Sequence, residues 1–154
     1  DVLVPPELLR LHREAHDVHL RKMVRGPVIN FDHLPPPPPP TQLWKHFSMN
    51  YLCTSNASLR RELLFEAGLF DESLERWEDA ELGVRLKKIG VERIFDNNAY
   101  VLHYKPEESW ESRCRTAARD GRSAALLYLR YPSLRMWMRS GLHRANEIRN
   151  KMML

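Results

Sequence analysis

Six consecutive prolines at residues 35–40 constrain the fold of this chain more strongly than any other part of its sequence. Proline has no backbone N–H group and holds φ at about −65°, so the run excludes both a helix and a central strand. We expect an extended polyproline II spacer on the surface. Because no flanking arginine pattern accompanies the prolines, a stiff surface loop is favoured over a ligand for an SH3-type domain.

Helical patterns occur on both sides of this run. One helix is expected after Pro5 and Pro6, since proline suits a first helical turn and apolar residues then recur on one face. Further helices are expected over 59–67, with Ser58 as N-cap, over 78–89, and from Ser109 until Pro132.

Short strand-like patterns lie between the helices. Strands are expected over 24–31, with an interruption at Gly26 and Pro27, and over 51–54, 93–95 and 100–103. Alternation of helices with strands predicts the α/β class. The number of strands is low for a complete doubly wound sheet, so we expect part of the sheet to precede Asp1.

The chain length and the cysteines limit the number of domains and the cellular compartment. A chain of 154 residues is long enough for one domain with a core. Cys53 and Cys114 match neither a disulfide framework nor a zinc spacing, which favours a reducing compartment. The sequence contains no signal peptide pattern at its start and no apolar stretch of bilayer-spanning length. These features predict a cytoplasmic protein.

The positive charge lies in the C-terminal third. Residues 105–154 contain 11 Lys or Arg against 5 Asp or Glu, whereas residues 1–104 contain 13 against 15. Arg115, Arg119 and Arg122 share one side of the expected helix, and another side is predicted to be apolar: Trp110, Cys114, Ala117, Gly121, Ala125 and Tyr128. Such a tail suits an anionic membrane surface or nucleic acid.

The acidic run from Trp77 to Gly83 opens the helix over 78–89. In ordinary helix chemistry, first-turn carboxylates complement the helix dipole, and Glu81 with Arg85 would form a surface ion pair. The catalytic interpretation is different. A carboxylate in a first helical turn, beside an aromatic ring, is well placed to take a proton from a sugar hydroxyl.

Four motifs decide between these interpretations. Residues 54–61 (TSNASLRR), 68–72 (GLFDE), 77–86 (WEDAELGVRL) and 99–103 (AYVLH) follow one another in an order and spacing that resembles the second half of a family 2 glycosyltransferase with the GT-A fold. The resemblance covers about residues 1–131. It implies a partial GT-A, Rossmann-like fold, with residues 1–108 as the acceptor-side part and residues 109–154 as a basic helical tail.

The resemblance also implies roles for single residues. Asp79 matches the catalytic base, and Glu78 matches the neighbour that holds the acceptor or shapes the site. Trp77 is placed to stack on an acceptor sugar. The same resemblance puts Asn56 and Ser58 in the segment between donor and acceptor. Asp1, in or next to the Asp-x-Asp motif, and His103, at a strand end, match positions that bind a divalent metal.

These roles describe an inverting transfer from a nucleotide-sugar to a glycan or lipid-linked acceptor. A general base contributes about 10²–10⁴-fold, and Mg²⁺ or Mn²⁺ would neutralise the leaving diphosphate. The donor-binding half is absent, so the fragment is expected to be inactive alone. No Gln-x-x-Arg-Trp motif follows His103, which argues against a processive polysaccharide synthase.

Other chemistries fit the sequence less well. Glu78 and Asp79 are adjacent on a helix and point about 100° apart, so they cannot form the facing carboxylate pair of a glycoside hydrolase. A histidine cluster, His12, His16 and His19, has metal-ligand spacing but no supporting ligand, which favours a solvated helix face. The second class of function is a non-catalytic module in which the basic tail binds the inner face of the cytoplasmic membrane; nucleic acid is the less favoured partner.

Overall fold

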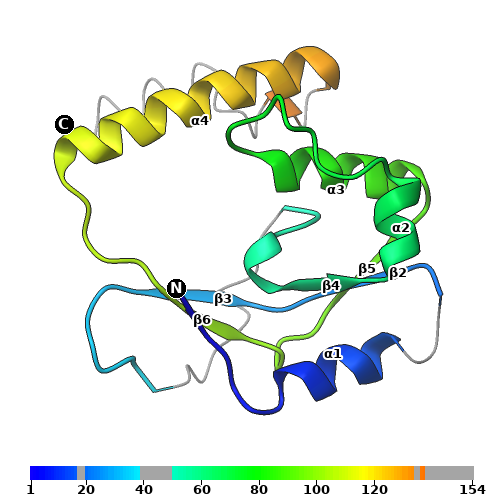
Figure 1. Cartoon of the computed structure of the whole chain (residues 1–154), viewed down its shortest axis with the longest axis horizontal. Helices are drawn as coiled ribbons and strands as arrows, with labels where there is room; N and C mark the ends of the chain where they lie inside the picture. The colour runs from blue at the N-terminus through cyan, green and yellow to red at the C-terminus, as the bar shows by residue number, and fades with distance from the viewer. Residues whose placement is uncertain (17–19, 39–49, 134–135, 138–154) are drawn as a thin grey trace. The chain divides into compact units, whose positions relative to one another are not determined.

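A computed structural model describes residues 1–16, 20–38, 50–133 and 136–137 (Figure 1). These residues form a mixed α/β structure, which confirms the predicted class at this level. They separate into two compact units, one made of Asp1–Phe70 and Asp79–Glu107, the other of Asp71–Glu78 with the chain from Glu108 onward. Each unit is described by itself.

The first unit contains all the strands that the structure describes. Its elements in chain order are β1 (Val2–Leu3), α1 (Leu8–His16), β2 (Lys22–Arg25), β3 (Val28–Phe31), a 3-10 turn (Thr54–Asn56), β4 (Ala57–Leu59), α2 (Arg61–Glu66), α3 (Glu78–Lys88, from Asp79), β5 (Glu92–Phe95) and β6 (Val101–Tyr104). Prolines 35–38 adopt neither helix nor strand, as predicted, and prolines 39 and 40 lie outside the described residues.

Two three-stranded sheets organise this unit, in the orders β4-β2-β5 and β1-β6-β3 (Figure 1). In the first sheet, β2 pairs in parallel with β5 and antiparallel with β4. In the second, β6 pairs in parallel with β3 and antiparallel with β1. The central strands β2 and β6 therefore each combine one parallel and one antiparallel neighbour.

The expected interruption at Gly26 and Pro27 divides one long strand into β2 and β3, which join different sheets. Pro27 has no N–H to continue a ladder, but its carbonyl accepts from the Val101 N–H at 3.0 Å. A Cβ on Gly26 would lie 1.7 Å from the Ala99 carbonyl oxygen, so only glycine fits this close approach. The chain passes from one sheet to the other at this point.

The core of the first unit is apolar and draws on helices and strands. Met23 of β2, Leu63 of α2 and Leu82 and Leu86 of α3 are buried in one cluster with Leu52, Ala67 and Val91. Leu82 and Leu86 are four residues apart and thus share one helix face. This packing fixes the orientation of α3 about its axis.

Two local predictions for residues 51–67 are wrong. Tyr51–Thr54 does not form a strand; the 3-10 turn starts at Thr54, and the strand is β4, three residues later. Ser58 is not a helix N-cap, because it lies within β4 and α2 begins at Arg61 after Arg60. Pairing of β4 with β2 therefore overrides the local helix signal.

The second unit contains α4 (Trp110–Arg130). Its start agrees with the sequence, since the Ser109 side chain accepts from the Ser112 N–H at 3.2 Å, and it ends two residues before Pro132. The predicted apolar side is wrong: Trp110 is exposed, and the residues that α4 buries are Ser123, Ala124 and Leu127.

Candidate functional site

The candidate base Asp79 lies in the first turn of α3, half-buried. The helix begins at Glu78 because Trp77 has a positive φ of 65°, which no helical residue adopts. Leu82 and Leu86 pack in the core, so their side of α3 faces inward. The amino end of a helix is a favourable place for a negative charge.

A buried arginine that sequence reasoning missed acts on Asp79. Arg25 of β2 is 1% exposed; its Nη1 donates to the Asn50 carbonyl, and its Cζ lies 5.9 Å from the centre of the Phe95 ring. Burial lowers the pKa of Arg25, whereas the charge of Asp79 raises it. A buried guanidinium requires nearby negative charge, and Asp79 supplies part of it.

Other groups around Arg25 extend this cluster. Cys53 raises the pKa of Arg25 and the neighbouring Arg93 lowers it. Arg93 also donates to the Asn50 carbonyl, at 2.9 Å. Within the described residues the Nε atom of Arg25 has no hydrogen-bond partner. An arginine between Val24 and Gly26 in an apolar stretch was the available sequence signal.

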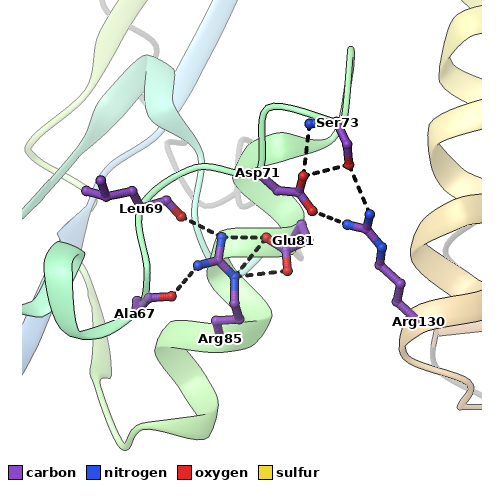
Figure 2. A network of polar contacts seen from close by, with 7 residues as sticks. All are labelled: Ala67, Leu69, Asp71, Ser73, Glu81, Arg85 and Arg130. Atoms are coloured by element: carbon purple, nitrogen blue, oxygen red, sulfur yellow. Dashed lines mark hydrogen bonds and ion pairs between the residues drawn. The ribbon is translucent and has the colours of Figure 1, made fainter.

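Glu81 and Arg85 form a buried ion pair, not the surface pair expected from their spacing. Arg85 Nη2 lies 2.6 Å from Glu81 Oε2, and the Glu81 side chain is only 3% exposed. Figure 2 shows the Arg85 guanidinium between Glu81 and the carbonyl groups of Ala67 and Leu69, to which it also donates. These two carbonyls belong to the turn after α2, where Gly68 has φ 86° and Leu69 has φ 60°. The pair therefore stabilises a turn, and neither residue is a candidate for catalysis.

Asn56 and Ser58 belong to an internal hydrogen-bond network. Asn56 is buried, and its Nδ2 donates to the carbonyls of Pro27 at 3.0 Å and Ala99 at 2.7 Å. Its Oδ1 lies 3.0 Å from His12 Nε2, and Ser58 Oγ lies 2.6 Å from His12 Nδ1. Their acceptor-binding role stays a prediction. In this structure, both side chains bind other parts of the protein.

The histidines of α1 differ from the solvated face that was expected. His12 is buried and His16 Nε2 lies 2.9 Å from Ser58 Oγ, while His19 lies outside the described residues. The sequence could not show this, because both partners are more than forty residues away.

Asp1 and His103, the predicted metal ligands, come from paired strands. Val2 lies opposite His103 in the β1–β6 pair, and Tyr104 N–H donates to the Asp1 carbonyl at 2.8 Å. His103 Nδ1 is 2.9 Å from Asn30 Oδ1. Burial lowers the pKa of His103, and the positive charges of the amino terminus and Lys105 lower it further. The neutral ring is the form that ligates metals.

Asp1 and His103 do not form a complete metal site with other described residues. Across the described ranges, no group of three or more His, Cys, Asp or Glu is arranged to hold a metal ion. Asp1 and His103 supply two of the ligand types that Mg²⁺ or Mn²⁺ accepts. The metal therefore stays a prediction.

Trp77 and Glu78 are both half-buried. Glu78 belongs with the segment Asp71–Glu78 of the second unit. In that unit, Arg76 Nε is 2.8 Å from Asp120 Oδ1, and this hydrogen bond raises the pKa of Arg76, with a smaller contribution from the charge of Glu78.

The basic tail is partly neutralised within the same unit. Arg119 pairs with Glu75 at 3.1 Å, and Arg130 pairs with Asp71 and donates to Ser73 at 3.0 Å. Figure 2 shows the Asp71 carboxylate between Ser73 and Arg130. These contacts reduce the charge available to an anionic partner.

No protein-family model matches the chain, and no curated protein matches it either. The glycosyltransferase resemblance therefore depends on the four motifs quoted above. Among the helices of the described residues, none is both long enough and apolar enough to cross a bilayer.

Proposed function

We propose that the chain is the acceptor-side part of a GT-A glycosyltransferase, which transfers a sugar from a nucleotide-sugar to a glycan or lipid-linked hydroxyl with inversion. Asp79 is the general base in this proposal. Glu78 and Trp77 hold the acceptor, and Asp1 and His103 contribute to a Mg²⁺ or Mn²⁺ site beside the diphosphate. The enzyme works at or near the cytoplasmic face of a membrane.

The position of Asp79 supports the proposal most directly. Asp79 lies in the first turn of a helix, it is partly accessible, and its charge interacts with that of the buried Arg25. The amino end of a helix is an electrostatically favourable place for a carboxylate. An ionised carboxylate at neutral pH can accept the proton of an attacking hydroxyl.

Asp79→Asn tests the base in a chain that also carries the donor-binding half. We expect transfer to fall by at least about a hundredfold, as removal of a general base does, while binding of the nucleotide measured by calorimetry is retained. Asp32→Asn is the matched control, because Asp32 lies on an exposed loop beside His33. Near-normal turnover by Asp79→Asn would remove Asp79 from the mechanism.

His103→Ala tests the metal in the same assay. We expect the concentration of Mn²⁺ or Mg²⁺ that gives half-maximal transfer to rise severalfold, because a ligand is lost. If the metal response is unchanged, His103 has only its observed role, the contact with Asn30.

The exposed face of α4 favours a second candidate, a module that binds a membrane surface. Arg115, Arg119, Arg122, Leu126 and Leu129 recur at steps of four and three residues, which places them on one face. Leu126 is 38% exposed and Leu129 is 73% exposed. Helices that lie on anionic bilayers combine basic side chains with exposed apolar side chains that can enter the interface.

Co-sedimentation of the whole chain with vesicles separates these options. Binding that requires anionic lipid and weakens in salt supports the module. Equal binding to neutral vesicles contradicts its electrostatic part. A salt-dependent shift of random DNA would indicate nucleic acid instead.

A further inference from the structure

A chain of hydrogen bonds connects α1 to both points at which the long strands break. His12 of α1 is 7% exposed and contacts Ser58 Oγ through Nδ1 at 2.6 Å and Asn56 Oδ1 through Nε2 at 3.0 Å. Asn56 in turn binds the carbonyl of Pro27, between β2 and β3, and that of Ala99, between β5 and β6.

The partners of Asn56 determine where each hydrogen lies. The carbonyls of Pro27 and Ala99 can only accept, so the atom that faces them is the amide nitrogen, and both of its hydrogens are used. Oδ1 therefore faces His12, and His12 Nε2 must carry a hydrogen to donate to it.

The same reasoning extends to the other ring nitrogen. A neutral imidazole with Nε2–H has a bare Nδ1, which accepts the hydroxyl hydrogen of Ser58. The Ser58 oxygen is then an acceptor for His16 Nε2–H at 2.9 Å. The network runs in one direction, from His16 through Ser58 and His12 to Asn56.

We propose that His12 is a positioning residue that must be neutral and protonated at Nε2, and that its protonation at Nδ1 is an acid-sensitive switch that loosens α1 from the two strand breaks. The role follows from the direction of the hydrogen bonds. This role of His12 affects the stability of the fold and does not depend on the proposed sugar transfer.

A second proton on His12 conflicts with its surroundings. Nδ1–H would then have to donate to Ser58 Oγ, and the Ser58 hydroxyl hydrogen would lose His12 as its acceptor while His16 Nε2 carries its own hydrogen. A positive charge would also be placed in a site that is 7% exposed, which is unfavourable without a paired carboxylate.

The charged groups around the ring act in opposite directions. Burial lowers the pKa of His12, whereas the hydrogen bond with Asn56 and the negative charge of Asp96 raise it, and burial has the larger effect. Asp96 lies in the turn after β5. The helix α1 packs on β2, whose charged residues are Lys22 and Arg25, and His16 is the titratable neighbour on α1 itself.

The sign of the pH dependence follows from this direction. The pKa of His12 is below 6.5 in the folded chain and close to 6.5 when the chain is unfolded. Between these values the unfolded chain binds more protons, so stability increases with pH. Stability is therefore lost as the pH falls below about 6.5.

Ring nitrogen NMR on the intact chain tests the assignment without any substitution. We expect His12 to be in the Nε2–H form at pH 7.5 and to titrate with a midpoint below the 6.5 of a free histidine. An Nδ1–H tautomer, or a midpoint at or above 6.5, would overturn the proposal.

Urea unfolding at pH 7.5 and 5.5 tests the switch. The unfolding constant of the unchanged chain should rise severalfold more on acidification than that of His12→Gln, up to the tenfold per pH unit that one proton allows. His33→Gln is the control, since the His33 side chain is 76% exposed, and it should keep the full rise. An equal rise in all three chains contradicts the switch; if His12→Gln does not fold, the NMR titration decides.

Discussion

Replacement of Glu81 by glutamine removes one charge from a buried pair and changes the shape of the side chain very little. Arg85 Nε lies 2.9 Å from both carboxylate oxygens, and Nη2 lies 2.6 Å from one of them and 2.6 Å from the Leu69 carbonyl. In Glu81→Gln the arginine keeps its position in the turn after α2 but loses the negative charge of Glu81.

The expected loss follows from the burial of the two side chains. Removing one partner of a buried pair costs about 3–5 kcal/mol, because a charge is left uncompensated. Glu81 is 3% exposed, but Arg85 is 21% exposed and keeps some contact with water. We therefore expect the lower end, about 3 kcal/mol, which is roughly a hundredfold in the unfolding constant.

Urea unfolding at pH 7, compared with the unchanged chain, measures this loss. Glu14→Gln is a matched control, because Arg10 and Glu14 have the same spacing of four residues, but their side chains are 53% and 51% exposed. An exposed pair of this kind contributes about 0.3–0.5 kcal/mol. A loss below about 1 kcal/mol for Glu81→Gln, or equal losses for both variants, would refute the argument from burial.

Two further predictions concern other parts of the chain. Gly26→Ala places a Cβ 1.7 Å from a backbone oxygen, so urea unfolding should show that the free energy of unfolding falls by about 1–3 kcal/mol or more. Gly121→Ala in α4 is the control, because its Cβ meets no atom within 4 Å and should stabilise the chain by about 1 kcal/mol. Similar effects of the two substitutions would contradict the close approach at Gly26. Hydrogen bonds from Ser73 and the charge of Arg130 lower the pKa of Asp71 from 3.8 to about 2. The stabilisation by Asp71 is complete above pH 3.8 and is lost as the pH falls toward 2. Carbon NMR of the Asp71 carboxyl group should therefore give a titration midpoint near 2, which rises in Ser73→Ala. An unchanged midpoint in that variant would show that Ser73 does not lower the pKa of Asp71.

The helices with strong local signals were predicted closely from the sequence. α3 starts at Glu78 and ends at Lys88, one residue before the expected end. α4 starts after Ser109 and stops at Arg130, ahead of Pro132. Helix caps, proline and the helical period of 3.6 residues are local signals, so the sequence around each helix is sufficient to predict where it begins and ends.

Features that depend on distant partners were missed. Ser58 has the residue type of an N-cap, but it is held in β4 by pairing with β2 and by His12. Arginine is mostly exposed in proteins and histidine is intermediate, and the burial of Arg25 and His12 reflects groups far along the chain. The helical position of Asp79 and the strand position of His103 could be expected from local patterns, whereas the turn that holds Asn56 and the contacts around all three could not. Their catalytic and binding roles stay predictions.

The two breaks between the sheets differ in length. In the first sheet Lys22 pairs with Glu92, and the residue numbers of the two partners differ by 70. In the second sheet Val28 pairs with Val101, and the residue numbers differ by 73. The connection from β5 to β6 thus absorbs three surplus residues, with Asn97 and Asn98 at an exposed tip. At its two ends, the N–H groups of Asp96 and Val101 donate to the carbonyls of Arg25 and Pro27. We therefore expect this tip to accept extra residues without any strand exchanging its neighbour.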